Sequence, residues 1–334
     1  MKKALHNLKT YTAALLCASC ALLGSTQAAA QDYPKDKPIS LIVPYPAGGP
    51  SDASARIFSE AISEYLKHNV VVENIGGATG AIAARRMLSD AADGYTFFHG
   101  SPNELILPTL TNKAVTFQPE DFELVQAITT ATIVVLTRAG LEVNNLDDLI
   151  RLAKNKDGAP LTYGSVGNGS LYHLLTERIK KDTGINVEHV PYRGSAPALT
   201  DLAGGQIDFA VLAFQTSMLG LQDQGRLKIL STLGSVAPEP LKDIPKIQDS
   251  ELLKDFDYGI RGGYFVKAGT PEEVKKVLRA AVGYALEKPD VRERLEIEGR
   301  IVYNPMSAEE NEALWNNEIS SLRELVDVVG FEPI

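Results

Sequence analysis

A loop rich in glycine and proline is the first stretch of the sequence that could hold a ligand. VPYPAGGPSD (43–52) lies between a β-branched strand pattern and a helical pattern. Gly48 and Gly49 would let the backbone approach a ligand oxygen with no Cβ in the way, and Ser51 or Asp52 is expected to cap the helix. The unpaired N–H groups at such a helix start suit a carboxylate or a phosphate. The alternative is a tight strand-to-helix turn that binds nothing.

Three further loops carry donors at equivalent positions, each after a strand pattern and before a helical one. They are NIGGATG (74–80), GSVGNGSLYH (164–173) and PYRGSAPAL (191–199). The first offers Thr79, and the second offers Ser165, Asn168 and Ser170. Because ligands of open α/β sheets bind outside the carboxyl ends of the strands, we expect these loops to converge on one ligand. Plain turns are the alternative, with Ser170 as a simple helix cap.

Two arginines are the sharpest candidates for a ligand carboxylate, because a guanidinium offers a bidentate pair of donors. Arg193 follows an apolar run, and Arg261 lies beside two glycines. For both, the alternative is an ion pair, either between two lobes of the protein or on its surface. The nearby AFQTS segment adds a candidate wall and two candidate donors, namely Phe214, Gln215 and Thr216. A simple turn is the alternative for that segment.

The sequence lacks the constellations that catalysis would need. It contains no G-x-S-x-G elbow, no H-E-x-x-H pair and, after its first thirty residues, no cysteine. The P-loop ending and the G-x-G-x-x-G fingerprint are also absent, which disfavours a nucleotide site. His68, His99, His173 and His189 are scattered without metal-ligand spacing. We therefore expect no metal, no cofactor and no catalytic residue, although His99 and His173 could donate to a ligand.

The first thirty residues are typical of a secretory signal and not of the fold. Lysines at the start are followed by an apolar run over 13–23 and then by small residues. Ala28 and Ala30 predict cleavage after Ala30, so that 1–30 is the signal peptide. Lipidation at Cys20 is an alternative. Both cysteines would leave with the signal, which excludes disulfides and thiolate metal sites from the mature chain.

Size and charge limit what the remaining chain can be. The 304 residues after Ala30 exceed what one core usually serves, which predicts two domains. Without the signal the chain has 30 basic and 42 acidic residues, a formal charge of −12. This charge disfavours a nucleic-acid surface. It does not exclude a small anionic ligand, because distant surface charges are screened beyond about 10 Å.

Short apolar runs alternate with helical patterns along most of the chain, which predicts an α/β protein with largely parallel sheets. Asn145 is positioned to cap one helix. The C-terminal third is predicted to be helical, with capping-box spacing at 270–273 and 307–310. No later stretch is long and apolar enough to predict a membrane span.

Six ordered blocks give the chain a family resemblance. They are YPKDKPISLIVPYPAGGPSDASAR, VVVENIGGATGAIAARRML, ADGYTFFHGS, LTYGSVGNGSLYHL, HVPYRGSAPALTDLAGGQIDFAV and VKAGTPEEVKKVL. From about Tyr33 to the C-terminus, the chain resembles the Bug family of periplasmic solute-binding proteins, the receptors of tripartite tricarboxylate transporters. The resemblance implies an α/β, two-lobed periplasmic binding protein fold of type II-like form. Each lobe would be a mixed sheet flanked by helices, and the ligand would bind in the cleft between the lobes.

The resemblance also implies the lobe boundaries and the contacts. Lobe 1 would comprise 31–133 plus 257–334 and lobe 2 would comprise 134–256, with crossing strands near 133–137 and 258–266. The expected ligand contacts are Tyr45, Ala47, Gly48, Gly49, Ser51, Asp52, Gly77, Ala78, Thr79, Ser101, Ser165, Asn168, Ser170, His173, Arg193, Gly194, Phe214, Gln215, Thr216 and Arg261. Pro50 replaces a usual glycine of the family and removes one N–H donor.

These features predict a monomeric periplasmic receptor and not an enzyme. Its partners would be a small organic carboxylate and the permease subunits of a tripartite tricarboxylate transporter. The arginines at 193 and 261 replace the family's frequent lysine and tryptophan, which suggests a dicarboxylate or an aromatic dicarboxylate such as terephthalate. One alternative is a receptor that presents its closed form to a signalling protein. The other is a lyase or hydrolase on the same scaffold that uses His99 or His173.

Overall fold

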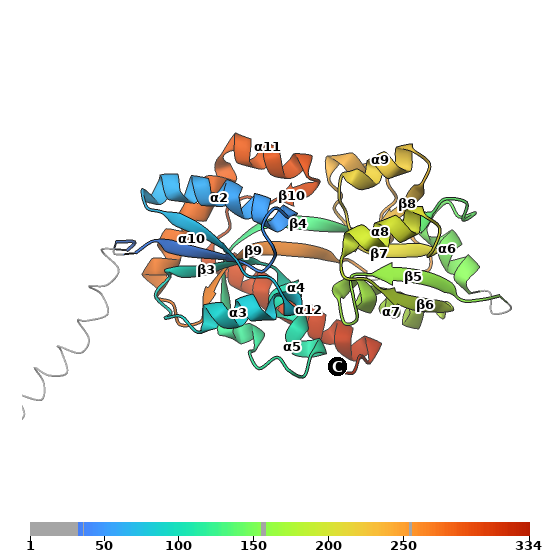
Figure 1. The fold of residues 1–334 in the computed structure, drawn as a ribbon, viewed down its shortest axis with the longest axis horizontal. Helices are drawn as coiled ribbons and strands as arrows, with labels where there is room; N and C mark the ends of the chain where they lie inside the picture. The colour runs from blue at the N-terminus through green and yellow to red at the C-terminus, as the bar shows by residue number, and fades with distance from the viewer. Residues whose placement is uncertain (1–32, 36, 155–157, 254–255) are drawn as a thin grey trace, which may run out of the picture.

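The computed structural model describes residues 33–334, apart from 36, 155–157 and 254–255, and shows two groups of strands with helices packed around them (Figure 1). The predicted signal peptide at 1–30 lies outside the described residues. Within the described part of the chain, every helix is too short or too polar to cross a bilayer. The predicted α/β class is confirmed, with sheets that are mixed and not largely parallel.

The first group of strands contains a parallel core. Its spatial order is β2 (Val70–Asn74), β1 (Ile39–Val43), β3 (Thr96–Gly100), β9 (Gly259–Lys267) and β4 (Phe122–Arg138). The first three strands are parallel, and β9 runs antiparallel to both β3 and β4. The central strand ISLIV is almost wholly buried, as expected where helices cover both faces of a parallel sheet. Short β10 (Arg300–Val302) pairs with the other edge of β4.

Helices and short turns connect these strands. They are α2 (Pro50–Leu66), η1 (Ala78–Gly80), α3 (Ala81–Leu88), α4 (Pro102–Leu105), α5 (Leu107–Thr111), η2 (Pro119–Asp121), α10 (Glu272–Glu287), α11 (Pro289–Ile297) and α12 (Ala308–Val329). Helices α2 and α10 pack against each other on one face. The long α12 runs below the strands toward the second group and contacts it near its end (Figure 1).

The second group repeats the strand-helix rhythm. Its order is β6 (Val187–Pro191), β5 (Leu161–Ser165) and β7 (Phe209–Ala213), followed by β4, which also pairs with β8 (Leu227–Thr232). Its helices and turns are α6 (Leu146–Ala153), α7 (Leu171–Thr183), α8 (Ser195–Ala203), α9 (Ser217–Asp223), η3 (Glu239–Leu241) and η4 (Ile247–Asp249).

One strand belongs to both groups. The residues of β4 up to Thr132 pair with β9, and from Ile133 onward they pair with β7. The chain therefore crosses along β4 and returns along β9, in the two regions where crossing strands are predicted. β4 starts earlier than expected, at Phe122. The lobe boundaries themselves, 31–133 with 257–334 and 134–256, stay a prediction.

The helix caps in the structure test the N-caps and capping boxes that the sequence predicts. Asn145 caps α6, and Ser307 forms the predicted capping box. The predicted box at 270–273 is wrong, because the Thr270 hydroxyl donates to the Lys267 carbonyl instead. The prediction that Ser51 or Asp52 caps α2 is also wrong. A proline at the first helical position presets the helical φ angle, so α2 begins earlier and Gly49 is its N-cap.

A buried asparagine fixes α12 to the crossing strand. Asn311 has no exposed surface, and its Oδ1 accepts a 2.7 Å hydrogen bond from the Ala127 N–H of β4. Its Nδ2 donates to the Ser307 carbonyl at 2.8 Å. The pairing of β4 with β9 is irregular just after Ala127, so this side chain satisfies a backbone donor at an interruption of the ladder.

Replacing Asn311 with alanine is expected to lower the free energy of unfolding by about 2 kcal/mol, because a buried N–H loses its acceptor. Urea denaturation of the purified protein measures the change. Asn316→Ala is the matched control, since Asn316 is exposed on the same helix, and it should stay within about 0.5 kcal/mol of the parent. Equal stabilities for the two variants would contradict this role of Asn311.

Candidate ligand-binding pocket

A polar cavity of about 160 Å³ lies where the two groups of strands meet. It is bordered by the end of β3, the start of β10, the middle of β4, the first half of β9, and the starts of α2, α4 and α7. Its lining residues are Tyr45, Ser51, Ser54, His99, Gly100, Ser101, Asn103, Glu104, Ile128, Thr129, Ala131, Tyr172, Ala213, Ile260, Gly262 and Arg300. We call this cavity the interlobe pocket.

Three of the expected contacts, Tyr45, Ser51 and Ser101, line the interlobe pocket, and so does His99. Ser51 lies in the first turn of α2, and Ser54 lies one turn further along. The first N–H groups of a helix have no partner within it. The start of this 17-residue helix therefore places hydroxyls and a partial positive charge at the pocket.

The first loop is held in shape by Asp52 and does not offer all of its donors. The Gly48 N–H donates to the Asp52 carboxylate at 2.8 Å, and Arg56 pairs with the same carboxylate. These bonds, led by that from Arg56, hold the pKa of Asp52 at about 2. Asp52 is thus a positioning group, and the N–H of Gly48 is already used. Neither residue, nor Ala47 or Gly49, lines the interlobe pocket.

The second loop supports the pocket from behind. Gly77, Ala78, Thr79 and Gly80 all have positive φ angles, of 121°, 47°, 52° and 87°. This is unusual for alanine and threonine. A Cβ on Gly80 would lie 2.7 Å from Cβ and Cγ of Glu104, so only glycine allows this close approach. The predicted contacts at 77–79 are exposed and do not line the pocket.

Glu104 lies beneath the pocket, with only 2 % of its surface exposed. It forms a capping box in which its Oε2 accepts from the backbone N–H and hydroxyl of Ser101, at 2.7 and 2.8 Å. The Tyr45 hydroxyl donates to its Oε1. Burial raises the pKa of Glu104, and the bonds from Tyr45 and Ser101 oppose that rise. The S-P-N-E spacing was the available signal for this residue, which the sequence analysis did not use.

His99 is a buried histidine at the end of β3. Its ring packs edge-on against Tyr264, with 5.2 Å between ring centroids. Its Nδ1 is buried without a hydrogen-bond partner among the described residues. Burial, assisted by the charge of Arg300, lowers the pKa of His99 to about 3. The imidazole is therefore neutral at physiological pH and lines the pocket with an unsatisfied ring nitrogen.

Arg300 is another residue of the pocket that sequence reasoning missed. It opens β10, and it is partly buried between lobes. Within the described chain its guanidinium has neither an ion pair nor a hydrogen bond. Burial lowers its pKa, and the charge of nearby Glu298 opposes that shift. A Cβ on Gly299 would lie 2.4 Å from Phe214, so this phenylalanine packs behind β10. Phe214 does not line the interlobe pocket, and its expected role as a wall for the ligand stays a prediction.

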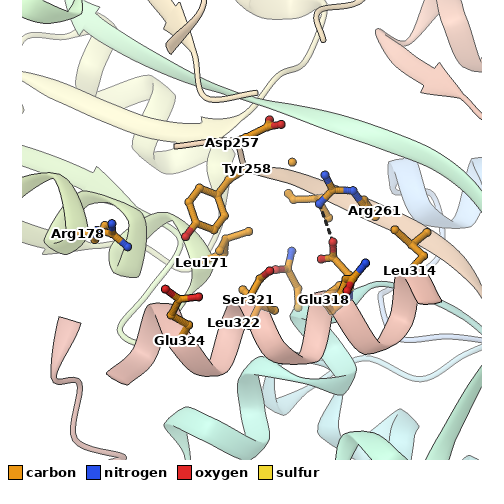
Figure 2. Close-up of a pocket in the computed structure, with 15 residues that line it drawn as sticks. Leu171, Arg178, Asp257, Tyr258, Arg261, Leu314, Glu318, Ser321, Leu322 and Glu324 are labelled. Atoms are coloured by element: carbon orange, nitrogen blue, oxygen red, sulfur yellow. Dashed lines mark hydrogen bonds and ion pairs between the residues drawn. The ribbon is translucent and has the colours of Figure 1, made fainter. Parts of the chain in front are cut away.

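Arg261 lies in a second cavity, of about 550 Å³, and not in the interlobe pocket. Figure 2 shows it pointing from β9 toward Glu318 on α12, with Arg178 and Glu324 elsewhere around the cavity. The Arg261 Nη1 lies 2.6 Å from the Glu318 Oε1. Burial raises the pKa of Glu318, and Arg261 opposes that rise. The ion pair that the sequence analysis held as the alternative is present.

The polar side chains in the loops of the second group of strands mostly contact residues of the same group. The Ser165 hydroxyl contacts Nε2 of His189 at 2.7 Å, and Ser170 caps α7. The His173 ring stacks on His189 with centroids 4.0 Å apart. The remaining expected contacts of this group, none of which lines the interlobe pocket, are Asn168, Arg193, Gly194, Gln215 and Thr216. Tyr172 and Ala213 line the pocket from this side instead.

The chemistry of the pocket is that of binding. The described residues include no group of three or more His, Asp or Glu side chains that could hold a metal ion. An arginine, serines and a helix start line a small cavity that is partly open to solvent. This arrangement can neutralise and hydrogen-bond an anion.

Comparison with known proteins supports a binding protein for small anions. The structure superposes on Rpa4515 of R. palustris, solved with adipate, with a TM-score of 0.77 and 28 % identity over 91 % of this chain and 100 % of that one. It also superposes on MatC of Rhodopseudomonas palustris, solved with bound malate, with a TM-score of 0.72 and 26 % identity over 87 % and 98 %. The two-lobed fold of a periplasmic solute-binding protein is thereby confirmed.

The family follows from sequence. Residues 54–331 match the model of the tripartite tricarboxylate transporter family receptor, and the chain belongs to this family. Protein BugT of Bordetella pertussis is 30 % identical over 277 residues, which cover 81 % of this chain and 82 % of BugT. The resemblance to the Bug family is confirmed, and proteins of this family are binding receptors of transporters.

The neutral His99 predicts a pH dependence of stability. Its pKa is about 3 in the folded protein and about 6.5 when unfolded, so between these values the unfolded chain binds more protons. The free energy of unfolding should therefore fall as pH drops from 6.5 toward 3, by at most about 1.4 kcal/mol per pH unit. His99→Phe should remove this share of the slope in urea titrations between pH 7 and 4. Parallel curves for parent and variant would contradict it.

Proposed function

We propose that the protein is a periplasmic receptor that captures a small organic carboxylate in the interlobe pocket and delivers it to the permease of a tripartite tricarboxylate transporter. The family assignment supports a transport receptor. Two similar structures were solved with adipate and with malate, which are both carboxylates. Dicarboxylates and aromatic dicarboxylates such as terephthalate are the first compounds to test. Secretion would use 1–30 as the signal peptide.

The unpaired guanidinium of Arg300 is the observation that carries this proposal. A guanidinium that is partly removed from water without an ion pair or hydrogen bond is costly, and a ligand carboxylate can supply both. The same pocket receives the start of α2 through Ser51 and Ser54. His99 adds a buried ring nitrogen without a partner. Three independent features therefore favour an anionic and polar occupant.

Closure of the two lobes would make the shape of the protein depend on whether a ligand is bound. Two strands, β4 and β9, and the helix α12 span the lobes, and the pocket is lined mainly by lobe 1 with Tyr172 and Ala213 from the other side. A ligand that contacts both sides stabilises whichever lobe arrangement brings them together. The permease could then recognise the occupied form. The expected contacts at Ser165, Arg193 and Gln215 would require such a movement and stay predictions.

Calorimetry of the ligand-free protein against a panel of carboxylates tests the proposal. Arg300→Gln should weaken the best binder by about 10- to 100-fold, because a hydrogen-bonded charge pair is worth about 1.5–3 kcal/mol. Arg226→Gln is the matched comparison, since Arg226 is exposed and lies outside the interlobe pocket. We expect it to change affinity less than twofold.

Two results would count against this account. If a correctly folded parent gives no heat with any carboxylate, the receptor proposal fails. If Arg193→Gln loses affinity while Arg300→Gln keeps it, the ligand binds through the lobe 2 loop as the sequence suggested, and the interlobe pocket is not the site.

A further inference from the structure

The polar atoms of the interlobe pocket are of two kinds, a cation with donors and a set of acceptors. We propose that the ligand carries, besides its carboxylate, a hydroxyl or ammonium group that donates hydrogen bonds to Tyr45, Asn103 and Glu104. This inference rests on the proposed function and narrows its ligand to hydroxy- or amino-substituted carboxylates.

The acceptors are defined by the bonds that already exist. The hydrogen of the Tyr45 hydroxyl is committed to Oε1 of Glu104, so the tyrosine oxygen is left with lone pairs. Three donors, the Tyr45 hydroxyl and the N–H and hydroxyl of Ser101, point at the Glu104 carboxylate. They favour its ionised form, which is only an acceptor. Oδ1 of Asn103 is buried in the described structure without a donor. All of these residues line the pocket, and they belong to the first loop, to α4 or to its N-cap.

Other groups of the pocket favour an anion instead of a hydrogen-bond donor. Arg300 supplies the positive charge, and Ser51 and Ser54 supply hydroxyls at the start of α2. His99 contributes no charge, because burial keeps its imidazole neutral. One carboxylate group is enough to complete the bonding of this part of the pocket.

A second carboxylate on the ligand would lie next to the negative charge of Glu104, which is unfavourable. Glu104 has 2 % of its surface exposed, and within the described residues it forms no ion pair with a cation. A ligand carboxylate beside it would bring two like charges together with little water to screen them. A hydroxyl or ammonium group in the same place would instead donate to Tyr45, Asn103 or Glu104. The pocket thus selects a donor where a plain diacid carries only acceptors.

Calorimetry with matched ligand pairs tests this selection. Each pair shares a carbon skeleton and differs in one donor: succinate with L-malate and L-aspartate, adipate with 3-hydroxyadipate, and terephthalate with 2-hydroxyterephthalate. For the skeleton that fits the pocket, we expect the substituted acid to bind at least tenfold more tightly. Equal or tighter binding of the unsubstituted diacid would overturn the inference while leaving the carboxylate receptor intact. No binding by any member would reject both.

Glu104→Gln provides the decisive variant. Glutamine preserves the capping-box acceptor for Ser101 but removes the negative charge, so unsubstituted diacids should gain affinity and the preference should fall below about threefold. Glu310→Gln is the matched control, because Glu310 occupies the same place in the exposed capping box at Ser307, and it should leave the preference unchanged. Thermal melting of each variant shows that it is folded. An unchanged preference in folded Glu104→Gln would contradict the assignment.

Discussion

Within the described residues, an arginine that forms no ion pair or hydrogen bond, placed where the lobes meet, is the feature on which the rest of this account depends. Arg300 opens a three-residue strand at the edge of β4, and burial already lowers its pKa. A fold that only needed stability would pair such a group or leave it in water, because a buried unpaired charge is destabilising. An unpaired arginine is understandable here if its partner is the ligand, because the bound anion would then offset the cost of the buried charge.

The surroundings of Arg300 keep the pocket in shape before any ligand arrives. Asp52 fixes the first loop by accepting from Gly48 and Arg56. Gly80 brings the second loop against Glu104, and the capping box at Ser101 orients that carboxylate. Such prior ordering lowers the entropy that binding must overcome. Most of these bonds involve residues of lobe 1, so this lobe would receive the ligand and the other lobe would close over it.

Sequence patterns predicted the fold better than the site. Alternating strands and helices and the six family blocks indicated an α/β two-lobed protein, and the positions of the crossing strands β4 and β9 followed. Local caps at Asn145 and Ser307 were also readable. The start of α2 was not, since the helix begins at Pro50 and Gly49 is its N-cap. These outcomes depend on short-range geometry, which spacing along the chain encodes directly.

The site depends on contacts between distant residues, and spacing does not encode those. Arg193 and Arg261 were conspicuous beside glycines, yet one is exposed and the other pairs with Glu318. Arg300 stood among mixed charges after α11 and had no glycine-rich loop to mark it. Only the pairing of β10 with β4 brings it near Tyr45 and Tyr172. Glu104 was likewise hidden inside a short capping box.

A crystal structure of the protein with its tightest-binding carboxylate tests the central claim most directly. The account predicts a ligand carboxylate within about 3 Å of the Arg300 guanidinium, at hydrogen-bonding distance. A carboxylate found instead in the Arg261 cavity or on the Arg193 loop, with Arg300 still unpaired, would contradict it.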